Sequence, residues 1–293
     1  MLLKEIKDIY HLELDLLFPK EEVDSFFYMV IEHYLGLERF ILALEPNLVV
    51  SKDNETDLFY ALSQLKLQRP IQYILGHAHF CDLSLQVDEN VLIPRPETEE
   101  LVYWILELAQ QGNFTLSSKE QGVRILDIGT GSGCIAITLA KKIPHAKVFA
   151  MDVSKKALRV AKRNALANNV EVQFIEADIL KDQDLKGEYD IIVSNPPYVR
   201  ELEKQQMKKN VLENEPDMAL FVSNEDPLLF YSSIVQFSLD HLAPGGMLFF
   251  EINQYLGAET KLLLGQENFS EIELRKDMFG NQRMLKGVFR SEG

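Results

Sequence analysis

The feature that most constrains this chain is a regular alternation of short apolar strands and helices that begins at Val123. Such an alternation builds a mostly parallel sheet with helices on both of its faces. The predicted strands are Val123–Ile128, Lys147–Met151, Val172–Glu176, Tyr189–Ser194 and Met247–Ile252, with Glu271–Lys276 and Gln282–Val288 as a closing pair. The predicted helices between them are Ile135–Lys142, Lys155–Asn168, Asp226–His241 and Gly257–Leu264. The pattern therefore predicts an α/β fold for this part.

The residues before this alternation have helical periodicity instead, with apolar side chains three and four positions apart. A length of 293 residues suggests two domains, at about 150 residues each. We predict a helical bundle over residues 1–75, a β-hairpin linker over 76–95 and an α/β domain over 96–293. The bundle is expected either to cap the fold or to dock a protein partner, and the residues alone favour neither.

Local signals place the smaller elements. In the bundle we expect helices over Leu2–Phe18, over Glu21–Leu35 before Gly36, and over Thr56–Leu67 after the capping residues Asp53 and Asn54. The hairpin is expected to pair Phe80–Val87 with Val91–Ile93 around a turn at residues 88–90. A helix should run from Pro96 to about Gln110 with Trp104 in the core, and residues 112–122 should form a polar loop.

Composition limits the partners and the compartment. The 45 acidic residues outnumber the 30 Lys and Arg residues, and a net charge of −15 repels nucleic acid and anionic membranes. We therefore expect no direct nucleic-acid partner and no membrane association. Cys81 and Cys134 have no metal-like spacing, so we expect neither a disulfide framework nor a metal site. No apolar run reaches 18 residues and the N-terminus is charged, which predicts a cytoplasmic protein.

The first α/β strand runs directly into three alternate glycines, Gly129, Gly131 and Gly133, with Thr130 and Ser132 between them. Glycines let the chain turn sharply and let a ligand approach the backbone N–H groups at the start of the next helix. The spacing differs from the dinucleotide fingerprint G-x-G-x-x-G, so the loop alone is weak evidence for a ligand.

Acids at the next two strand ends strengthen that evidence. Asp152 follows the second strand, 21 residues after Gly131, where an acid in this architecture accepts hydrogen bonds from ribose hydroxyls. Asp178 follows the third strand and is expected to border an adenine ring, with Ile179 packed on its face. The three strand ends together predict a nucleoside site.

The fourth strand ends in Asn195-Pro196-Pro197-Tyr198. A planar NH₂ group offers two N–H donors, which Asn195 Oδ1 and the Pro196 carbonyl are placed to accept. The two prolines fix the backbone and remove competing donors, and Tyr198 adds a flat wall. An Asn-Pro turn without function is the alternative. We interpret the motif as a clamp that turns the nitrogen lone pair toward an electrophile.

The glycine loop, Asp152 and Asn195–Tyr198 together resemble the S-adenosylmethionine-dependent amino methyltransferases. The four-residue motif is shared by N6-adenine DNA methyltransferases and protein-glutamine N5-methyltransferases, because both substrates offer a planar NH₂. Further segments resemble the glutamine methyltransferases that modify peptide chain release factors: Gln72–Gly76, Leu92–Glu99, Glu215–Pro216, Ala219–Leu220 and Gly280–Arg283. The resemblance spans Leu65 to Phe289.

That resemblance implies a Rossmann-like class I methyltransferase sheet, mostly parallel with an antiparallel closing strand. It also implies S-adenosylmethionine as cofactor, S-adenosylhomocysteine as product and, as substrate, the glutamine of the Gly-Gly-Gln loop of class 1 release factors. The N-terminal bundle would help to hold the factor. Some family members carry an aromatic residue at Ile179, so apolar contact rather than stacking is expected there.

The resemblance also assigns roles to the motif residues. By motif, Gly129–Gly133 would line the methionine part of the cofactor, Asp152 the ribose, and Asp178 with Ile179 the adenine. Asn195 would also border the cofactor, and Asn195, Pro196, Pro197 and Tyr198 would hold the substrate amide, with Asn195, Pro196 and Tyr198 as the catalytic residues.

The expected reaction is a direct in-line methyl transfer to the glutamine side-chain nitrogen by a monomer, without metal or covalent enzyme intermediate. His77, His79 and Cys134 are expected to be structural. Three alternatives stay open: a glutamine methyltransferase of a ribosomal protein, an N6-adenine DNA methyltransferase, and a docking module without catalysis. The negative charge argues against the DNA enzyme.

Overall fold

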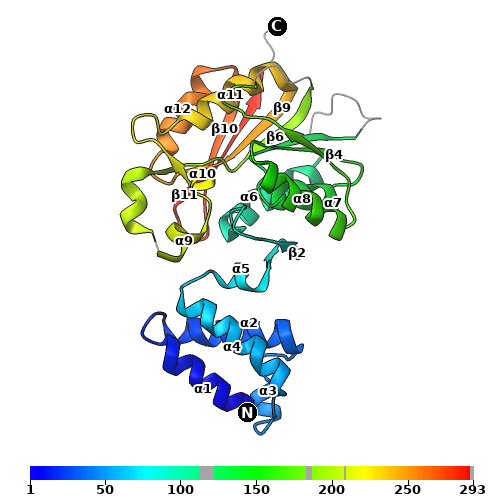
Figure 1. The fold of residues 1–293 in the computed structure, drawn as a ribbon. Coiled ribbons are helices and arrows are strands. Elements are labelled where there is room, and N and C mark those ends of the chain that lie inside the picture. Colours follow the sequence, from blue (N-terminus) through cyan, green and yellow to red (C-terminus); the bar gives the residue numbers. More distant parts are fainter. Residues whose placement is uncertain (113–121, 183–186, 208, 291–293) are drawn as a thin grey trace. The chain divides into compact units, whose positions relative to one another are not determined.

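The computed structural model describes residues 1–112, 122–182, 187–207 and 209–290 (Figure 1). The chain divides into two compact units. The smaller unit contains residues 1–77 and 208–214, and the larger unit contains residues 78–207 and 215–293. The predicted polar loop at 112–122 lies almost wholly outside the described residues.

The smaller unit is helical. Its elements are α1 (Leu3–Leu14), α2 (Lys20–Leu35), α3 (Ile41–Leu44), α4 (Lys52–Lys66), α5 (Ile71–Leu75) and α9 (Lys209–Asn214). The apolar faces of α1, α2 and α4 share one core, in which the Tyr10 hydroxyl donates to the Leu58 carbonyl oxygen at 2.5 Å. Helix α2 ends at Leu35, before Gly36, as predicted. Gly36 adopts a φ of +64°, which terminates the helix.

The predicted caps of α4 are wrong. The helix begins at Lys52, four residues before the predicted start, and Ser51 is its N-cap. The Ser51 hydroxyl oxygen accepts the Asn54 backbone N–H at 3.3 Å, so Asp53 and Asn54 lie inside the first turn.

The hairpin is present, but its turn is not where the sequence predicts it. Strands β1 (His77–Phe80) and β2 (Leu83–Gln86) form a two-stranded sheet. The turn residues Cys81 and Asp82 both have positive φ, which is the geometry of a two-residue hairpin turn. The Asp88 carboxylate instead accepts the Asn90 N–H at 3.0 Å, so residues 88–90 make a local bend, and Val91–Ile93 are not a strand.

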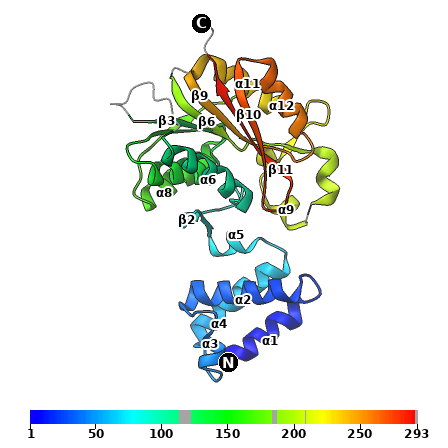
Figure 2. The ribbon, with the colours of Figure 1, turned by 180° about the vertical axis from the view of Figure 1, so that it is seen from behind.

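The larger unit is built on a seven-stranded sheet in the order β10-β11-β9-β6-β3-β4-β5 (Figures 1 and 2). These strands are β3 (Arg124–Ile128), β4 (Lys147–Asp152), β5 (Val172–Glu176), β6 (Tyr189–Ser194), β9 (Leu242–Glu251), β10 (Phe269–Lys276) and β11 (Gln282–Phe289). Strand β11 runs antiparallel to both β9 and β10, and the other neighbouring strands described in this sheet are parallel. The predicted mostly parallel sheet with an antiparallel closing strand is confirmed.

Helices cover both faces of this sheet. Helices α6 (Pro96–Gln110), α7 (Cys134–Lys142) and α8 (Lys155–Ala167) share one core with the sheet, and Trp104 lies in that core as predicted. Helices α11 (Leu229–His241) and α12 (Gly257–Gln266) share a second core. The sequence missed five short elements between β6 and α11: β7 (Val199–Arg200), the 3₁₀ helix η1 (Glu201–Gln206), α9, α10 (Asp217–Leu220) and β8 (Phe221–Val222).

The register of the sheet decides which residues meet at its carboxyl edge. Ile128 pairs with both Met151 and Ser194, which brings the ends of β3, β4 and β6 together. Ser194 also pairs with Phe250, which brings Asn195, the first residue after β6, near Glu251, the last residue of β9.

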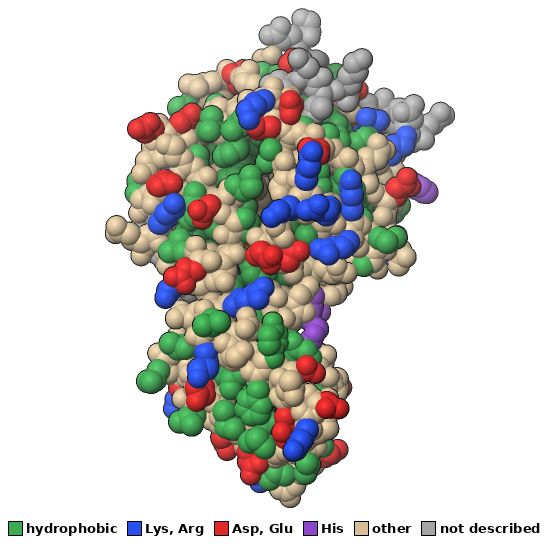
Figure 3. Space-filling view, viewed as in Figure 1, with side chains coloured by type: hydrophobic (Ala, Val, Ile, Leu, Met, Phe, Trp, Pro, Cys, Tyr) green, Lys and Arg blue, Asp and Glu red, His purple; other side chains and the backbone are tan. Residues whose placement is uncertain are grey.

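The negative charge of the chain is unevenly distributed. The exposed residues of α8 include five basic side chains and no acidic one, namely Lys155, Lys156, Arg159, Lys162 and Arg163. Figure 3 shows Lys and Arg side chains gathered over this region of the larger unit, beside apolar side chains at its centre. No helix within the described part of the chain is long and apolar enough to cross a membrane.

Candidate active site

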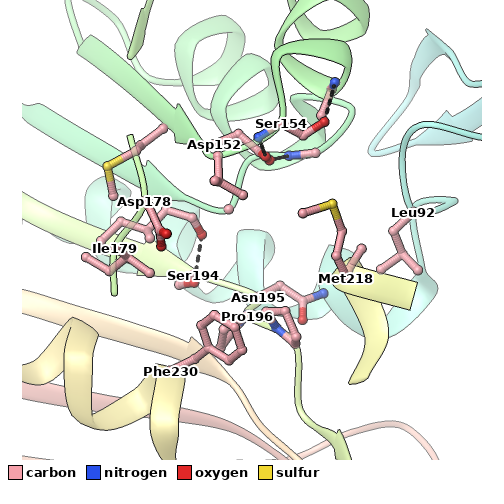
Figure 4. A pocket seen from close by; sticks show the side chains of 18 of the residues that line it. Leu92, Asp152, Ser154, Asp178, Ile179, Ser194, Asn195, Pro196, Met218 and Phe230 are labelled. Carbon is pink, nitrogen blue, oxygen red and sulfur yellow. Dashed lines mark hydrogen bonds between the residues drawn. The ribbon is translucent and has the colours of Figure 1, made fainter. Parts of the chain in front are cut away.

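A cavity of about 340 Å³ opens at the carboxyl ends of β3, β4, β5 and β6. Its volume lies in the range of small-molecule sites, and this edge is where open α/β sheets bind ligands. Figure 4 shows Asp152 and Ser154 on one side of the cavity and Asn195 and Pro196 on another. Eight of the residues predicted for the site line it: Gly129, Gly131, Asp152, Asp178, Ile179, Asn195, Pro196 and Pro197.

The glycine loop is fastened to the neighbouring strand. The backbone N–H groups of Gly129 and Thr130 both donate to the Met151 carbonyl oxygen, at 2.8 and 2.9 Å. Gly129 and Gly131 have positive φ, and a Cβ atom on either would meet no protein atom within 4 Å. The loop therefore leaves open space beside its backbone, which suits the close approach of a ligand.

The other three loop residues have internal roles. A Cβ atom on Gly133 would lie 2.7 Å from Ile137 Cδ1 and 3.2 Å from Ala161 Cβ, so this glycine allows α7 and α8 to pack closely. Thr130 and Ser132 are buried and do not line the cavity. The Ser132 carbonyl oxygen accepts the Asn164 side-chain N–H at 2.9 Å.

Asp127 organises the loop, and the sequence analysis missed it. Its Oδ2 accepts the Thr130 hydroxyl at 2.6 Å and the Ala136 N–H at 3.2 Å, while its Oδ1 is buried without a hydrogen-bond partner. Burial, with a smaller contribution from the Asp152 charge, raises the pKa of Asp127 to about 7. An acid inside the apolar run of β3, directly before the glycines, was the available signal.

Asp152 lies at the end of β4 as predicted, and two backbone groups hold its carboxylate. Oδ2 accepts the Gly131 N–H at 2.9 Å and Oδ1 accepts the Ser154 N–H at 2.8 Å. Each oxygen retains a second lone pair, so the carboxylate is oriented and can still accept hydrogen bonds from a ligand. Burial raises the pKa of Asp152, whereas the two N–H donors lower it.

Asp178 and Ile179 line a further side of the cavity (Figure 4). The Asp178 carboxylate accepts Lys181 Nζ at 2.7 Å and the Leu180 N–H at 3.0 Å, and the Lys181 hydrogen bond lowers the pKa of Asp178. Ile179 is buried in the core shared by α11 and α12, which gives this side of the cavity an apolar surface.

Asn195 is held by a chain of side chains that sequence reasoning missed. Its Nδ2 donates to Thr98 Oγ1 at 3.1 Å, and the Thr98 hydroxyl donates to Glu251 Oε2 at 2.6 Å. Thr98 belongs to α6 and Glu251 ends β9, so neither lies near Asn195 in sequence. The contact with Thr98 occupies the NH₂ group of Asn195 and leaves Oδ1 available as an acceptor.

Tyr198 does not line this cavity. Its hydroxyl donates to Glu251 Oε1 at 2.8 Å, and the residue lines a smaller cavity of about 160 Å³ with Glu203, Asn253 and Arg283. Burial and the neighbouring Glu251 charge raise the pKa of Tyr198. The predicted role of Tyr198 against the substrate stays a prediction.

An ion pair between the half-buried Arg95 and the buried Glu215 lies beside another wall of the cavity. Glu215 accepts Arg95 Nη2 at 2.6 Å and the Ile93 N–H at 3.1 Å. This fastens the segment before α6 to the segment before α10, and Leu92 and Pro216 beside these contacts line the cavity. Among the residues that the structure describes, no group of three or more His, Cys, Asp or Glu side chains is placed to hold a metal ion.

The known proteins and the family model that this chain matches are methyltransferases. The family model described as "Methyltransferase small domain" matches residues 114–220. A release factor glutamine methyltransferase of Flavobacterium psychrophilum is 51% identical over 290 residues, covering 99% of this chain and 100% of the relative. Another, from Bacteroides thetaiotaomicron, is 40% identical over 270 residues, covering 92% of this chain and 94% of the relative.

Among solved structures, a T. thermophilus 16S rRNA N2 methyltransferase in complex with AdoMet and guanosine has a TM-score of 0.50 and 17% identity. The match covers 73% of this chain and 50% of that one, and it shows a shared fold alone. The sequence relatives go further, since they match almost the whole chain at high identity. The chain therefore belongs to the release factor glutamine methyltransferases, as the motifs in its sequence indicated.

Proposed function

We propose that this protein methylates the side-chain nitrogen of the glutamine in the Gly-Gly-Gln loop of class 1 peptide chain release factors, with S-adenosylmethionine as methyl donor. The observation that carries the proposal is the orientation of Asn195, whose NH₂ group is bound to Thr98 and whose Oδ1 is left to accept an amide N–H. The names of the relatives support the choice of release factor over other amides.

The cavity fits the proposed cofactor. Open space beside Gly129 and Gly131, an oriented carboxylate on Asp152 and an apolar surface at Ile179 suit an amino acid, a ribose and a purine. When bound, S-adenosylmethionine supplies a methyl group on a positively charged sulfur and becomes S-adenosylhomocysteine. The protein's own contribution is alignment and exclusion of water.

Asn195 and Pro196 orient the substrate amide in this proposal. A glutamine NH₂ donates one proton to Asn195 Oδ1 and the other to the Pro196 carbonyl oxygen, which directs the lone pair of the nitrogen toward the donor. Both carboxylates that line the cavity are held by other groups, Asp152 by backbone N–H groups and Asp178 by Lys181. We therefore infer that the nitrogen keeps both protons, bound to Asn195 Oδ1 and the Pro196 carbonyl oxygen, until the new C–N bond makes it acidic. One proton then passes to solvent water, so that no separate general base is needed.

The helical unit is proposed to dock the release factor. It carries large exposed apolar side chains, among them Leu12, Leu16 and Leu44, which a monomer would otherwise leave in water. Changing Leu12 and Leu16 to serine should raise KM for the factor without changing kcat, whereas the exposed polar control Glu21→Gln should change neither.

The proposal is tested by offering the wild-type protein three substrates with radiolabelled cofactor: a class 1 release factor, whole ribosomal subunits and duplex DNA. We expect label on the release factor alone. Label on a ribosomal protein would favour the first alternative. Label on duplex DNA, lost steeply with added salt, would indicate electrostatic binding to the phosphate backbone and would overturn the proposal.

A further inference from the structure

We propose that Glu251 is a positioning residue that fixes the direction of the hydrogen bonds through Thr98, and thereby decides which end of the Asn195 amide faces the cavity. The inference rests on the proposed function, because it concerns how the protein presents an acceptor to the substrate amide. It assigns a role to a buried acid that takes no direct part in the transfer.

The three groups are contributed by different elements and meet in one chain. Thr98 is the third residue of α6, Asn195 follows β6, and Glu251 is the last residue of β9. The distances are 3.1 Å from Asn195 Nδ2 to Thr98 Oγ1 and 2.6 Å from Thr98 Oγ1 to Glu251 Oε2. The second oxygen of Glu251 accepts the Tyr198 hydroxyl at 2.8 Å, so both ends of the Asn195–Tyr198 motif connect to this carboxylate.

The direction of these bonds follows from the number of protons. An ionised carboxylate can only accept, so the single hydroxyl proton of Thr98 is committed to Glu251. The oxygen of Thr98 can then only accept from its other neighbour, and Asn195 must turn its NH₂ group toward it. The two ends of an asparagine amide have nearly the same shape, so packing alone does not distinguish them. The charge of Glu251 distinguishes the two ends, because it decides which of them faces Thr98.

Loss of the negative charge of Glu251 would leave the direction of the hydrogen bonds through Thr98 unfixed. With a proton on Glu251, or with glutamine in its place, one of the two oxygen positions becomes a donor. Thr98 could then donate to Asn195 Oδ1, and the amide would present its NH₂ group to the cavity. Two N–H donors would face each other when a glutamine substrate enters, and both would lack an acceptor.

Groups from several elements act on the charge of Glu251. The side chain is 1% exposed, and burial raises its pKa. The hydrogen bonds from Thr98 and Tyr198 and the Arg283 charge on β11 lower the pKa, while the Glu97 charge on α6 raises it. From α11, the Tyr231 hydroxyl donates to the backbone carbonyl oxygen of Glu251 at 3.4 Å. A buried carboxylate is costly for a fold, and an apolar residue would fill this place at lower cost.

The test compares Glu251→Gln, Thr98→Val and Thr98→Ser, with the exposed Glu171→Gln as control. Glu251→Gln and Thr98→Val should lower kcat for the release factor about 5- to 160-fold, the factor equivalent to about 1–3 kcal/mol, with cofactor affinity unchanged. Thr98→Ser keeps the hydroxyl and should restore most of the activity. If Thr98→Ser is as impaired as Thr98→Val, or if Glu251→Gln keeps wild-type kcat, the proposal is wrong.

The pH profile separates positioning from a merely structural contact. As pH falls through the raised pKa of Glu251, wild-type kcat should fall, because the protonated acid no longer fixes Thr98. Glu251→Gln should lack this acidic limb and Glu171→Gln should keep it. An unchanged limb in Glu251→Gln would overturn the proposal.

A measurement without release factor distinguishes this proposal from the proposed function. In ¹⁵N-asparagine-labelled protein, the side-chain amide of Asn195 is identified by its absence in Asn195→Ala. One of its protons should exchange slowly with solvent in the wild type and rapidly in Thr98→Val. Rapid exchange in the wild type would contradict the hydrogen-bond chain even if methylation is observed. A wild-type protein that shows slow exchange but no methylation would instead contradict the proposed function.

Discussion

The two sides of the cavity are built in different ways. On the cofactor side, Asp152 is held by the backbone N–H groups of Gly131 and Ser154, and the glycine loop is held by the Met151 carbonyl oxygen. On the amide side, Asn195 is held by the side chains of Thr98 and Glu251, which are far from it in the sequence. The first side is a property of a βα unit, while the second exists only when α6, β6 and β9 have come together.

The two sides of the cavity should therefore differ in how well they tolerate side-chain substitutions. Backbone N–H donors remain in place whatever side chains surround them. Few single substitutions should therefore remove a hydrogen bond on the cofactor side. A chain of side chains fails when any one link is lost, since the remaining buried groups lose their partners. We therefore expect substitutions on the two sides to separate cofactor binding from transfer.

The largest effect is expected for Asn195→Ala. Removing the acceptor should lower kcat about 10³-fold, the loss typical of removing one preorganised hydrogen-bond partner of a reacting group. Cofactor affinity, measured by calorimetry, should stay near wild type because Asp152 and the glycine loop are intact. Near-normal turnover by this variant would show that methyl transfer does not depend on Asn195.

The opposite result is expected for Asp152→Asn. One of the two backbone N–H groups would face an NH₂ donor, so cofactor affinity should fall about 5- to 160-fold, equivalent to about 1–3 kcal/mol. At saturating cofactor, kcat should be close to wild type. A variant that binds cofactor normally but transfers slowly would show that the two sides are not separable.

Asp127→Asn tests the loop through the pH dependence of stability. Asp127 has a pKa of about 7 in the folded protein against 3.8 for an ordinary aspartate, so the folded state binds this proton more tightly. Its contribution to stability is present below about pH 4 and is lost as pH rises toward 7. Between pH 5 and pH 8 the wild type should therefore lose about 2 kcal/mol relative to the variant, whose side chain does not titrate. Urea unfolding at the two pH values measures this, and a constant difference would refute it.

The smallest effect is expected for Lys181→Ala. The ion pair with Asp178 is exposed at the lysine, and such pairs contribute little, so cofactor affinity should change by less than about threefold. The variant should bind cofactor with less dependence on salt than wild type. A large loss of affinity would mean that the orientation of Asp178 depends on Lys181 in the way that Asn195 depends on Thr98.

The same contrast explains what the sequence could predict. Gly129, Gly131 and Asp152 were found because a ligand-binding βα unit places its residues at fixed short spacings. The roles of Thr98 and Glu251 were missed. Thr98 lies in the segment Leu92–Glu99 that carries the family resemblance, and Glu251 is an acid within an apolar strand, but nothing in the local sequence shows that the two side chains meet at Asn195. Asp127 carried a local signal, an acid within an apolar strand, that was not used.

The fold shows the same limit on a smaller scale. Six strands of the sheet were predicted to within two residues, since each has an apolar period and clear ends. Strand β9 begins at Leu242, five residues before the predicted start, because Pro244-Gly245-Gly246 interrupts its apolar pattern. The hairpin turn was misplaced because Asp88-Glu89-Asn90 and Cys81-Asp82 are both acceptable turn sequences, and only pairing with the other strand decides between them. The short elements between β6 and α11 have no periodicity to reveal them.

Methylation of the glutamine side-chain nitrogen is tested best by locating the transferred methyl group. A class 1 release factor is incubated with wild-type protein and cofactor, and the peptide that contains Gly-Gly-Gln is fragmented by tandem mass spectrometry. We expect one added methyl group on the glutamine side-chain nitrogen, formed about 10³-fold more slowly when Asn195→Ala replaces the wild type. A methyl group on any other residue, or equal methylation by Asn195→Ala, would contradict the proposed function.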